Sequence, residues 1–316
     1  MQLKNNPAVG AEHIFPSAIR RNIIYKERRI MAGKNVPIIE LIIYTDPYCT
    51  WCWGSEPILR KIMEVYGGQV RLRSVMGGLV EDATRFQDPL NHIGGPQMAR
   101  QVADHWREAS SRHGMPVDAD VWLDMKDEFR STWPANIAYK SAELQDQKLV
   151  SKYLRRLREA AAAERRLIHR VEVQAELADE VGLDRERFLA EIENGNAEKA
   201  FREDLKRCRA NNITGYPSYE VHGGGEEVAM FGYHNFAAFE STFQRLAGNK
   251  LKPGRIETTD DNIVAFARKY GKVAAREVAE VFSLKISEAR ERLDRLASEG
   301  RLKKQKAGNG WFYLSA

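Results

Sequence analysis

The sequence is poor in the residues that would build a metal site or a disulfide framework. Its 316 residues contain three cysteines and seven histidines, and Cys49 and Cys52 form the one closely spaced cysteine pair. A structural zinc site takes four ligands, commonly from two such pairs. Cys208 stands alone, however, and no histidine pair with ligand spacing accompanies it. We therefore expect no metal ion and no organic cofactor.

The chain also has no long hydrophobic run. No stretch of about 18 apolar residues is present, so the sequence predicts no membrane-spanning helix and no membrane partner. Residues 1–34 carry basic residues without the apolar segment of a secretion signal. Few cysteines and no secretion signal are typical of a reducing compartment. We therefore expect a cytoplasmic protein whose cysteine pair rests reduced.

The net charge of +5 is distributed unevenly along the chain. Residues 1–34 carry +5, residues 35–249 carry −6 and residues 250–316 carry +6. We interpret residues 1–35 as a flexible basic leader without a core of its own. The positive charge at the C-terminal end allows an anionic partner there.

A strand-to-helix transition carries the cysteine pair. Residues 38–44 form a short apolar run of β type, and residues 53–66 show helical spacing of apolar residues, with Pro57 expected to bend that helix. The start of a helix offers free backbone N–H groups and the positive end of its dipole. A thiol placed there has a lowered pKa and becomes a nucleophile near neutral pH. We therefore predict that Cys49 attacks and that Cys52, one turn later, resolves.

A second candidate segment, Thr214–Ser218, lies far along the chain. A Gly-x-Pro turn opens a run of β type there. Proline is the residue that accepts a cis peptide bond at low cost. A cis Pro217 would face the cysteine pair and leave the Tyr216 carbonyl free to pair with an extended peptide. The alternative is an ordinary trans proline at the start of an edge strand.

Together these segments resemble the DsbA-like branch of the thioredoxin superfamily, in particular its cytosolic disulfide oxidoreductase and isomerase-like members. The resemblance is carried by the segments Asp46–Gly54, Ser131–Ala135 and Thr214–Ser218. It implies an α/β protein: a thioredoxin fold at residues 36–249, split by an all-helical insertion at about residues 79–210.

The resemblance also implies a functional site. The implied catalytic residues are Cys49, Cys52 and a cis Pro217 beside them. From the residues themselves we expect Tyr216, Trp51 and Trp53 to bind substrate. Because Thr50 and Trp51 stand between the cysteines and no histidine does, a strongly oxidising pair is not expected.

One predicted helix of the insertion, residues 149–168, is rich in arginine. Arg155, Arg156, Arg158, Arg165 and Arg166 are interleaved with Glu159 and Glu164. Mixed charges of this kind are typical of a solvated helix face, which is how we interpret them.

The C-terminal end reads as a separate small domain, residues 260–316, after a linker at residues 250–259. The pattern predicts a helix from Asp260, a helix at residues 274–282, a helix at residues 288–299 with Ser287 as its cap, and two strands around an Asn-Gly turn. This order resembles a winged helix-turn-helix domain.

Such a domain can bind DNA, with its third helix in the major groove and its wing on the backbone. The basic residues placed for phosphate contacts are Lys285, Arg290, Lys303, Lys304 and Lys306. Glu288, Glu291 and Asp294 on the same helix would repel DNA, and winged helices also bind proteins. Both kinds of partner stay open.

The leading functional hypothesis is a protein-disulfide oxidoreductase or isomerase that acts on protein or peptide disulfides and thiols. The alternatives are a redox-sensing regulator, in which the cysteine pair controls what the C-terminal domain binds, and an adaptor that delivers clients to a protease. A homodimer stays open as the oligomeric state.

Overall fold

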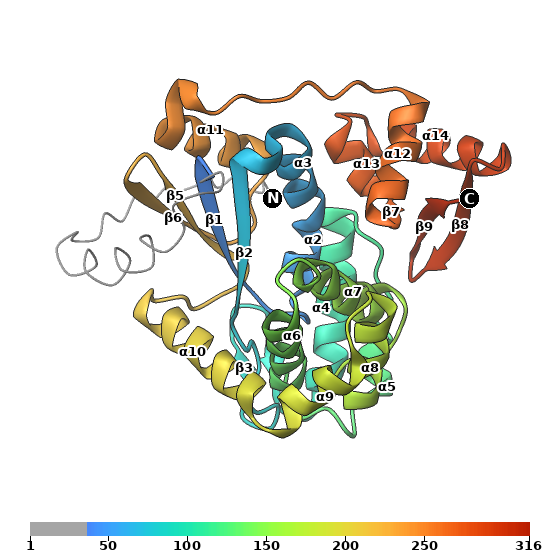
Figure 1. The fold of residues 1–316 in the computed structure, drawn as a ribbon. Helices are drawn as coiled ribbons and strands as arrows, with labels where there is room; N and C mark the ends of the chain where they lie inside the picture. The colour runs from blue at the N-terminus through green and yellow to red at the C-terminus, as the bar shows by residue number, and fades with distance from the viewer. Residues whose placement is uncertain (1–36) are drawn as a thin grey trace, which may run out of the picture. The chain divides into compact units, whose positions relative to one another are not determined.

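The structure, a computed structural model, describes residues 37–316 (Figure 1). The predicted basic leader, residues 1–35, lies outside the described residues.

A four-stranded mixed sheet forms the centre of the fold, with strand order β2-β1-β5-β6 (Figure 1). Its strands are β1 (Ile39–Thr45), β2 (Val70–Met76), β5 (Ser218–Gly223) and β6 (Glu226–Phe231). β1 pairs in parallel with β2 and antiparallel with β5, and β5 forms a hairpin with β6. The largely β-branched sequence of β1 suits this central place, since every residue except Glu40 is buried.

Two helices cover one face of this sheet. α3 (Glu56–Tyr66) and α11 (Phe236–Ala247) share a core with the strands, formed in part by Ile58, Ile62, Phe239 and Phe243. Their apolar residues recur at helical spacing, which places them on one side of each helix. α11 begins as predicted, because the Asn235 side chain accepts a hydrogen bond from the Ala238 N–H at 3.0 Å.

The helix after the cysteine pair is interrupted. α2 (Thr50–Gly54) ends before Ser55, and α3 begins at Glu56. Pro57 therefore stands in the first turn of α3, where a missing backbone N–H costs nothing. The predicted bend inside one continuous helix is wrong for this reason.

The expected all-helical insertion is present between β2 and β5. It contains α4 (Met98–His113), α5 (Val121–Asp124), α6 (Trp133–Gln145), α7 (Val150–Ala163), α8 (Val171–Glu180), α9 (Arg185–Glu193) and α10 (Asn196–Ala210). A small hairpin of β3 (Gln87–Asp88) and β4 (Ile93–Gly94) precedes them, and 3₁₀ turns lie at Gly67–Gln69, Gly95–Gln97 and Gly248–Lys250. The thioredoxin fold split by helices is thus confirmed.

The arginine-rich face of α7 is not solvated, so that interpretation is wrong for Arg155, Arg156 and Arg158. Arg165, beyond the end of α7, is 45% exposed. Arg158 is 2% exposed and Glu159 is 4% exposed. Their partners lie on α3 and near the C-terminal end of the chain, and such remote partners cannot be inferred from charge spacing within one helix.

The last part of the chain, residues 260–316, is called the C-terminal module below. It contains α12 (Asp260–Tyr270), β7 (Lys272–Ala274), α13 (Ala275–Val281), α14 (Ile286–Ser298), β8 (Leu302–Ala307) and β9 (Gly310–Ser315). The strands form a sheet of order β7-β9-β8. β7 was not predicted, and the Ser287 cap is wrong because α14 already begins at Ile286.

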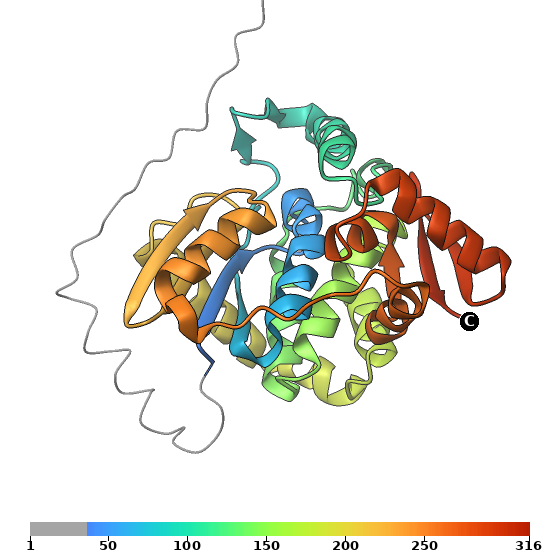
Figure 2. The ribbon, with the colours of Figure 1, turned by 90° about the horizontal axis from the view of Figure 1, so that it is seen from above.

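The C-terminal module packs on the rest of the fold at several places, two of which involve α13 and the β8–β9 hairpin. α13 lies against α3, and the turn of the β8–β9 hairpin lies against the loop after α4. There the Asn309 N–H donates to the Val117 carbonyl at 2.9 Å, and the Val117 N–H donates to Asn309 Oδ1 at 2.9 Å. Figures 1 and 2 show the linker running from α11 to α12, and the Gly254 N–H on it donates to the Val65 carbonyl of α3 at 2.6 Å.

No helix in residues 37–316 is both long and apolar enough to cross a membrane.

The hairpin turn provides a test of this docking. Gly308 has a φ of +46°, and a Cβ there would lie 2.2 Å from the Val117 carbonyl carbon. Gly300 has a φ of +74° with nothing within 4 Å of the same point, so Gly300→Ala carries the backbone strain without the clash. We expect Gly308→Ala to cost roughly 1–3 kcal/mol more than Gly300→Ala. Trypsin should then cut the linker after Arg255 faster in Gly308→Ala, and equal cutting rates in the two variants would contradict the docking.

Candidate functional site

The cysteine pair occupies the strand-to-helix transition that the sequence predicts. Cys49 is the residue immediately before α2, and the Cys52 N–H points at Cys49 Sγ at 3.1 Å. The structure holds the two residues as a disulfide, with their Cα atoms 5.1 Å apart. When the bond is reduced, the same N–H groups and the helix dipole would stabilise a thiolate on Cys49.

The second candidate segment lies directly against this pair. The Tyr216–Pro217 peptide bond is cis, and the Tyr216 carbonyl oxygen lies 3.5 Å from Cys49 Sγ. The Tyr216 hydroxyl donates to the Gly77 carbonyl at 2.8 Å. A Cβ on Gly77 would lie 2.0 Å from the Tyr216 ring, so only glycine fits there. The sequence alone did not indicate this role of Gly77.

A buried carboxylate holds the surrounding loops in place. Asp46 is fully buried and accepts hydrogen bonds from the N–H groups of Tyr48 and Leu79, both at 2.8 Å. It also accepts from the Thr132 hydroxyl at 2.9 Å and the Asn136 amide at 2.8 Å. Burial raises the pKa of Asp46, and these four hydrogen bonds oppose that rise. Thr132 lies within the Ser131–Ala135 segment that the sequence analysis singled out, and Asn136 follows it directly, but the sequence alone assigned neither residue a role at the site.

A buried histidine, His113, contacts Thr50, the residue that follows Cys49. His113 is 2% exposed, and its Nδ1 accepts from the Met115 N–H at 3.1 Å. The neutral ring therefore carries its proton on Nε2, which lies 3.4 Å from the Thr50 hydroxyl. A Cβ on Gly54 would lie 2.6 Å from the ring. Burial, with a smaller effect from the Arg276 charge, lowers the pKa of His113 to about 4.

The two tryptophans predicted to bind substrate have different environments. Trp51 is partly exposed and lies 5.6 Å from the Tyr233 ring, centroid to centroid. Trp53 is 1% exposed, and its indole N–H donates to the Pro116 carbonyl at 2.9 Å. The prediction that Trp53 contacts substrate is therefore wrong, because its whole side chain is core.

Both sulfurs are largely covered. Cys49 is 5% exposed and Cys52 is 2% exposed. Thr214 and Gly215, which precede Tyr216, are exposed. A partner would therefore reach Cys49 along this loop. Cys208 takes no part in the disulfide and packs in a small core with Tyr44, against which Tyr216 also packs. It is 4% exposed, and burial raises the pKa of its thiol to about 12.

The basic residues predicted to contact DNA are all exposed, but their surroundings do not favour DNA binding. These residues are Lys285, Arg290, Lys303, Lys304 and Lys306. Lys304 already pairs with Asp294 at 2.6 Å, and the turn of the hairpin, which would form the tip of a wing, is occupied by its contacts with Val117.

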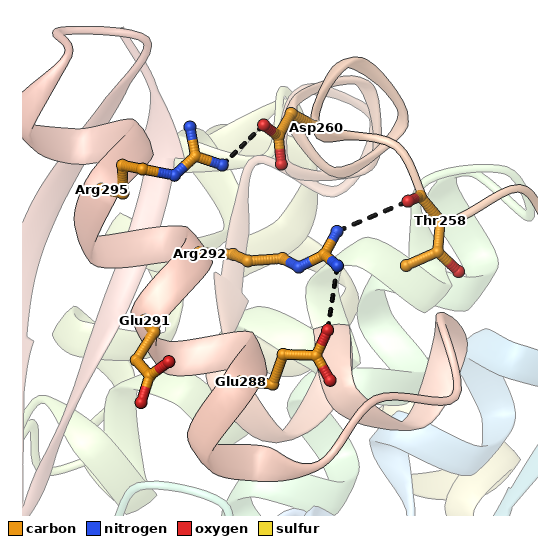
Figure 3. Close-up of a pocket in the computed structure, with 6 residues that line it drawn as sticks. All are labelled: Thr258, Asp260, Glu288, Glu291, Arg292 and Arg295. Carbon is orange, nitrogen blue, oxygen red and sulfur yellow. Dashed lines mark hydrogen bonds and ion pairs between the residues drawn. The ribbon is translucent and has the colours of Figure 1, made fainter.

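Charged side chains that line a groove beside α14 also pair with one another (Figure 3). Arg292 donates to Glu288 at 2.9 Å, and Arg295 donates to Asp260 at 2.6 Å. DNA binding by α14 stays a prediction that this arrangement does not support. No group of three or more His, Cys, Asp or Glu side chains in residues 37–316 is placed to hold a metal ion.

The fold and the cysteine pair define a thioredoxin-family protein. A family model described as "Thioredoxin" matches residues 42–241, and the chain belongs to this family. The thioredoxin fold predicted from the sequence is confirmed.

Two curated relatives extend over nearly the whole chain. The ClpXP adapter protein SpxH of Halalkalibacterium halodurans is 30% identical over 281 residues, covering 87% of this chain and 89% of the relative. The protein of the same name from Bacillus subtilis is 25% identical over 280 residues, covering 88% and 89%. These matches extend beyond the 200 residues that the family model covers.

A solved structure supports the fold. The cytosolic disulfide reductase DsbM from Pseudomonas aeruginosa matches with a TM-score of 0.52 and 24% identity, covering 66% of this chain and 100% of its own. At this identity the similarity establishes the fold alone.

The pKa of His113 predicts a pH dependence of stability. Its folded-state value of about 4 lies below the usual 6.5, so the unfolded chain takes up a proton first as the pH falls. The stabilisation from neutral His113 is complete above about pH 6.5 and is lost as the pH falls to about 4, by about 3 kcal/mol in total. Urea unfolding at a series of pH values should show a shallower loss in His113→Gln. Equal slopes in both proteins would refute this role of His113.

Proposed function

We propose that this protein performs thiol–disulfide exchange with protein or peptide partners through Cys49 and Cys52. The observation that carries the proposal is the position of Cys49 Sγ, which lies at the start of α2 and 3.5 Å from the Tyr216 carbonyl. The helix start stabilises the thiolate, and the carbonyl offers an acceptor for the backbone of an extended partner.

In the reducing direction, the Cys49 thiolate attacks one sulfur of a substrate disulfide. A mixed disulfide forms, and the other substrate sulfur leaves as a thiolate. Cys52 then loses its proton and attacks Cys49 Sγ, which releases the second substrate thiolate. The substrate gains two electrons and the cysteine pair becomes the disulfide seen in the structure. A low-molecular-weight thiol or a protein dithiol would regenerate the reduced pair.

Substitution of each cysteine should separate the two roles. Cys49→Ser should abolish reduction of insulin by dithiothreitol above the uncatalysed rate, because it removes the attacking sulfur. Cys52→Ser should accumulate a mixed disulfide, visible on a non-reducing gel and lost on reduction. Full turnover by Cys52→Ser would show that Cys52 does not resolve. Cys208→Ser serves as the matched control and should retain wild-type turnover, since Cys208 takes no part in the disulfide.

A second candidate function is an adaptor for ClpXP. It is favoured by relatives named ClpXP adapters that match 87% and 88% of this chain, beyond the thioredoxin part. The small exposure of Cys49 is also compatible with it, since an adaptor works by binding and needs no open sulfur. The two functions are not mutually exclusive.

The double variant Cys49→Ser/Cys52→Ser distinguishes the two functions. For an adaptor, degradation of a client by purified ClpXP should be accelerated equally by the wild-type protein and the double variant. Thiol–disulfide exchange should be lost in that variant. Acceleration that disappears with the cysteines would mean that the pair serves the adaptor function, and no acceleration by either protein would exclude ClpXP adaptation of that client.

We also propose the domain organisation that the sequence predicts, with a thioredoxin domain at residues 36–249, a linker at residues 250–259 and a winged-helix domain at residues 260–316. The element order helix, strand, helix, helix, strand, strand in the last part supports it. A cytoplasmic location stays a proposal from the sequence, and the redox-sensing role is taken up in a narrower form below.

A further inference from the structure

A buried network of charged side chains joins the C-terminal module to the helix that follows the cysteine pair. Six of its members come from α3, α7 and α13. They are Glu56, Arg60, Arg155, Arg158, Glu159 and Glu277. Their side chains are at most 11% exposed, so water screens their charges poorly.

Glu277 is the member that the C-terminal module contributes to these six. Its side chain is 0% exposed, and its Oε1 lies 2.8 Å from both Arg60 Nη1 and Arg155 Nη1. Its Oε2 lies 3.2 Å from Arg155 Nη2 and accepts from the Ala274 N–H at 2.8 Å. Every lone-pair direction of this carboxylate is therefore used within the interface.

The six groups carry three positive and three negative charges. Without the carboxylate of Glu277, the arginines would outnumber the glutamates by one, inside a region that excludes water. An uncompensated buried charge acts strongly on ionisable groups nearby.

This region adjoins the cysteine pair. The Arg155 guanidinium lies 4.4 Å from the centre of the Trp53 ring, and Trp53 follows Cys52 directly. Arg158 donates to Glu56 and to Thr45, the last residue of β1. The network thus lies against both the helix and the strand that hold the two sulfurs.

The C-terminal module also contributes one positive charge, that of Lys272. Lys272 lies 2.5 Å from Glu164 and 3.6 Å from Glu159, and its side chain is 20% exposed. Its positive charge compensates the glutamates at the end of α7, nearer to solvent. Its effect on the cysteine pair should therefore be smaller than that of Glu277.

We propose that Glu277 tunes the reactivity of the cysteine pair from the C-terminal module. Its negative charge opposes the charge of Arg60 and Arg155, which would otherwise stabilise a thiolate on Cys49. The module thereby keeps the disulfide form favoured and the pKa of the Cys49 thiol higher than the thioredoxin part alone would set it. This inference assumes the proposed thiol chemistry of Cys49 and Cys52.

The effect is reciprocal by thermodynamic linkage. If the Glu277 carboxylate disfavours a thiolate on Cys49, then a thiolate weakens the hold of the arginines on Glu277. Formation of the thiolate would therefore loosen the contact between α13 and α3, and oxidation would tighten it.

The proposal is tested by measuring the thiol–disulfide equilibrium between the full-length protein and glutathione. Two glutathione thiols reduce the Cys49–Cys52 disulfide and become one glutathione disulfide; the protein gains one thiol and one thiolate, and one proton is released. In Glu277→Gln, which keeps the shape and removes the charge, the equilibrium should shift toward the reduced pair by roughly three- to tenfold.

Three further variants separate charge from structure. Glu277→Asp keeps the charge and should stay close to wild type. Lys272→Gln should shift the equilibrium the other way and by less. Glu280→Gln removes a partly exposed carboxylate on the same helix, paired with Arg276 at 2.9 Å, and should leave it unchanged. Equal equilibria in wild type and Glu277→Gln, or equal shifts in Glu277→Gln and Glu277→Asp, would overturn the proposal.

A second measurement does not depend on exchange with glutathione. In chemically reduced protein, the midpoint of the pH profile for alkylation of Cys49 by iodoacetamide should move to lower pH in Glu277→Gln and not in Glu277→Asp. A wild-type protein that fails to exchange with any thiol would reject the proposed function, while this profile still decides whether Glu277 acts on Cys49. An unmoved midpoint would overturn the inference alone.

Discussion

One buried carboxylate sets the arrangement on which the rest of the site depends. Asp46 binds the N–H groups of Tyr48 and Leu79 and the side chains of Thr132 and Asn136. A fully buried carboxylate is tolerated only when its oxygens are hydrogen-bonded. The loop before the cysteine pair, the loop after β2 and the start of α6 must therefore come together as one unit. The helical insertion is in this way part of the site rather than an appendage to the sheet.

Features set by neighbouring residues in the chain could be predicted from the sequence. The cysteine pair at a helix start, the Asn235 cap and the β5–β6 hairpin each depend on a few adjacent residues. Features set by remote partners could not. β7 has three residues and is defined by its pairing with β9. Trp53 was predicted to contact substrate because the hydrogen-bond partner of its indole, the Pro116 carbonyl, lies in another segment of the chain.

The arginines of α7 illustrate the same limit for charge. Alternating arginine and glutamate along a helix is typical of a solvated face, and within one helix no signal distinguishes a buried face of this composition. Arg155 and Arg158 are buried because Glu56 and Glu277 reach them from α3 and α13. The sequence could show the charges but not their partners. This interface bears on both functional alternatives, catalysis at the cysteines and binding by the protein surface.

The linker has a consequence for any protein that competes with the C-terminal module for α3. Beyond the contact of Gly254 with Val65, the Gln69 side chain donates to the Lys252 carbonyl at 2.7 Å and accepts from its N–H at 2.9 Å. The module is thus tethered close to its own binding surface. A short tether gives an effective concentration of about millimolar order, which an external competitor has to exceed through abundance or through contacts beyond those the module makes.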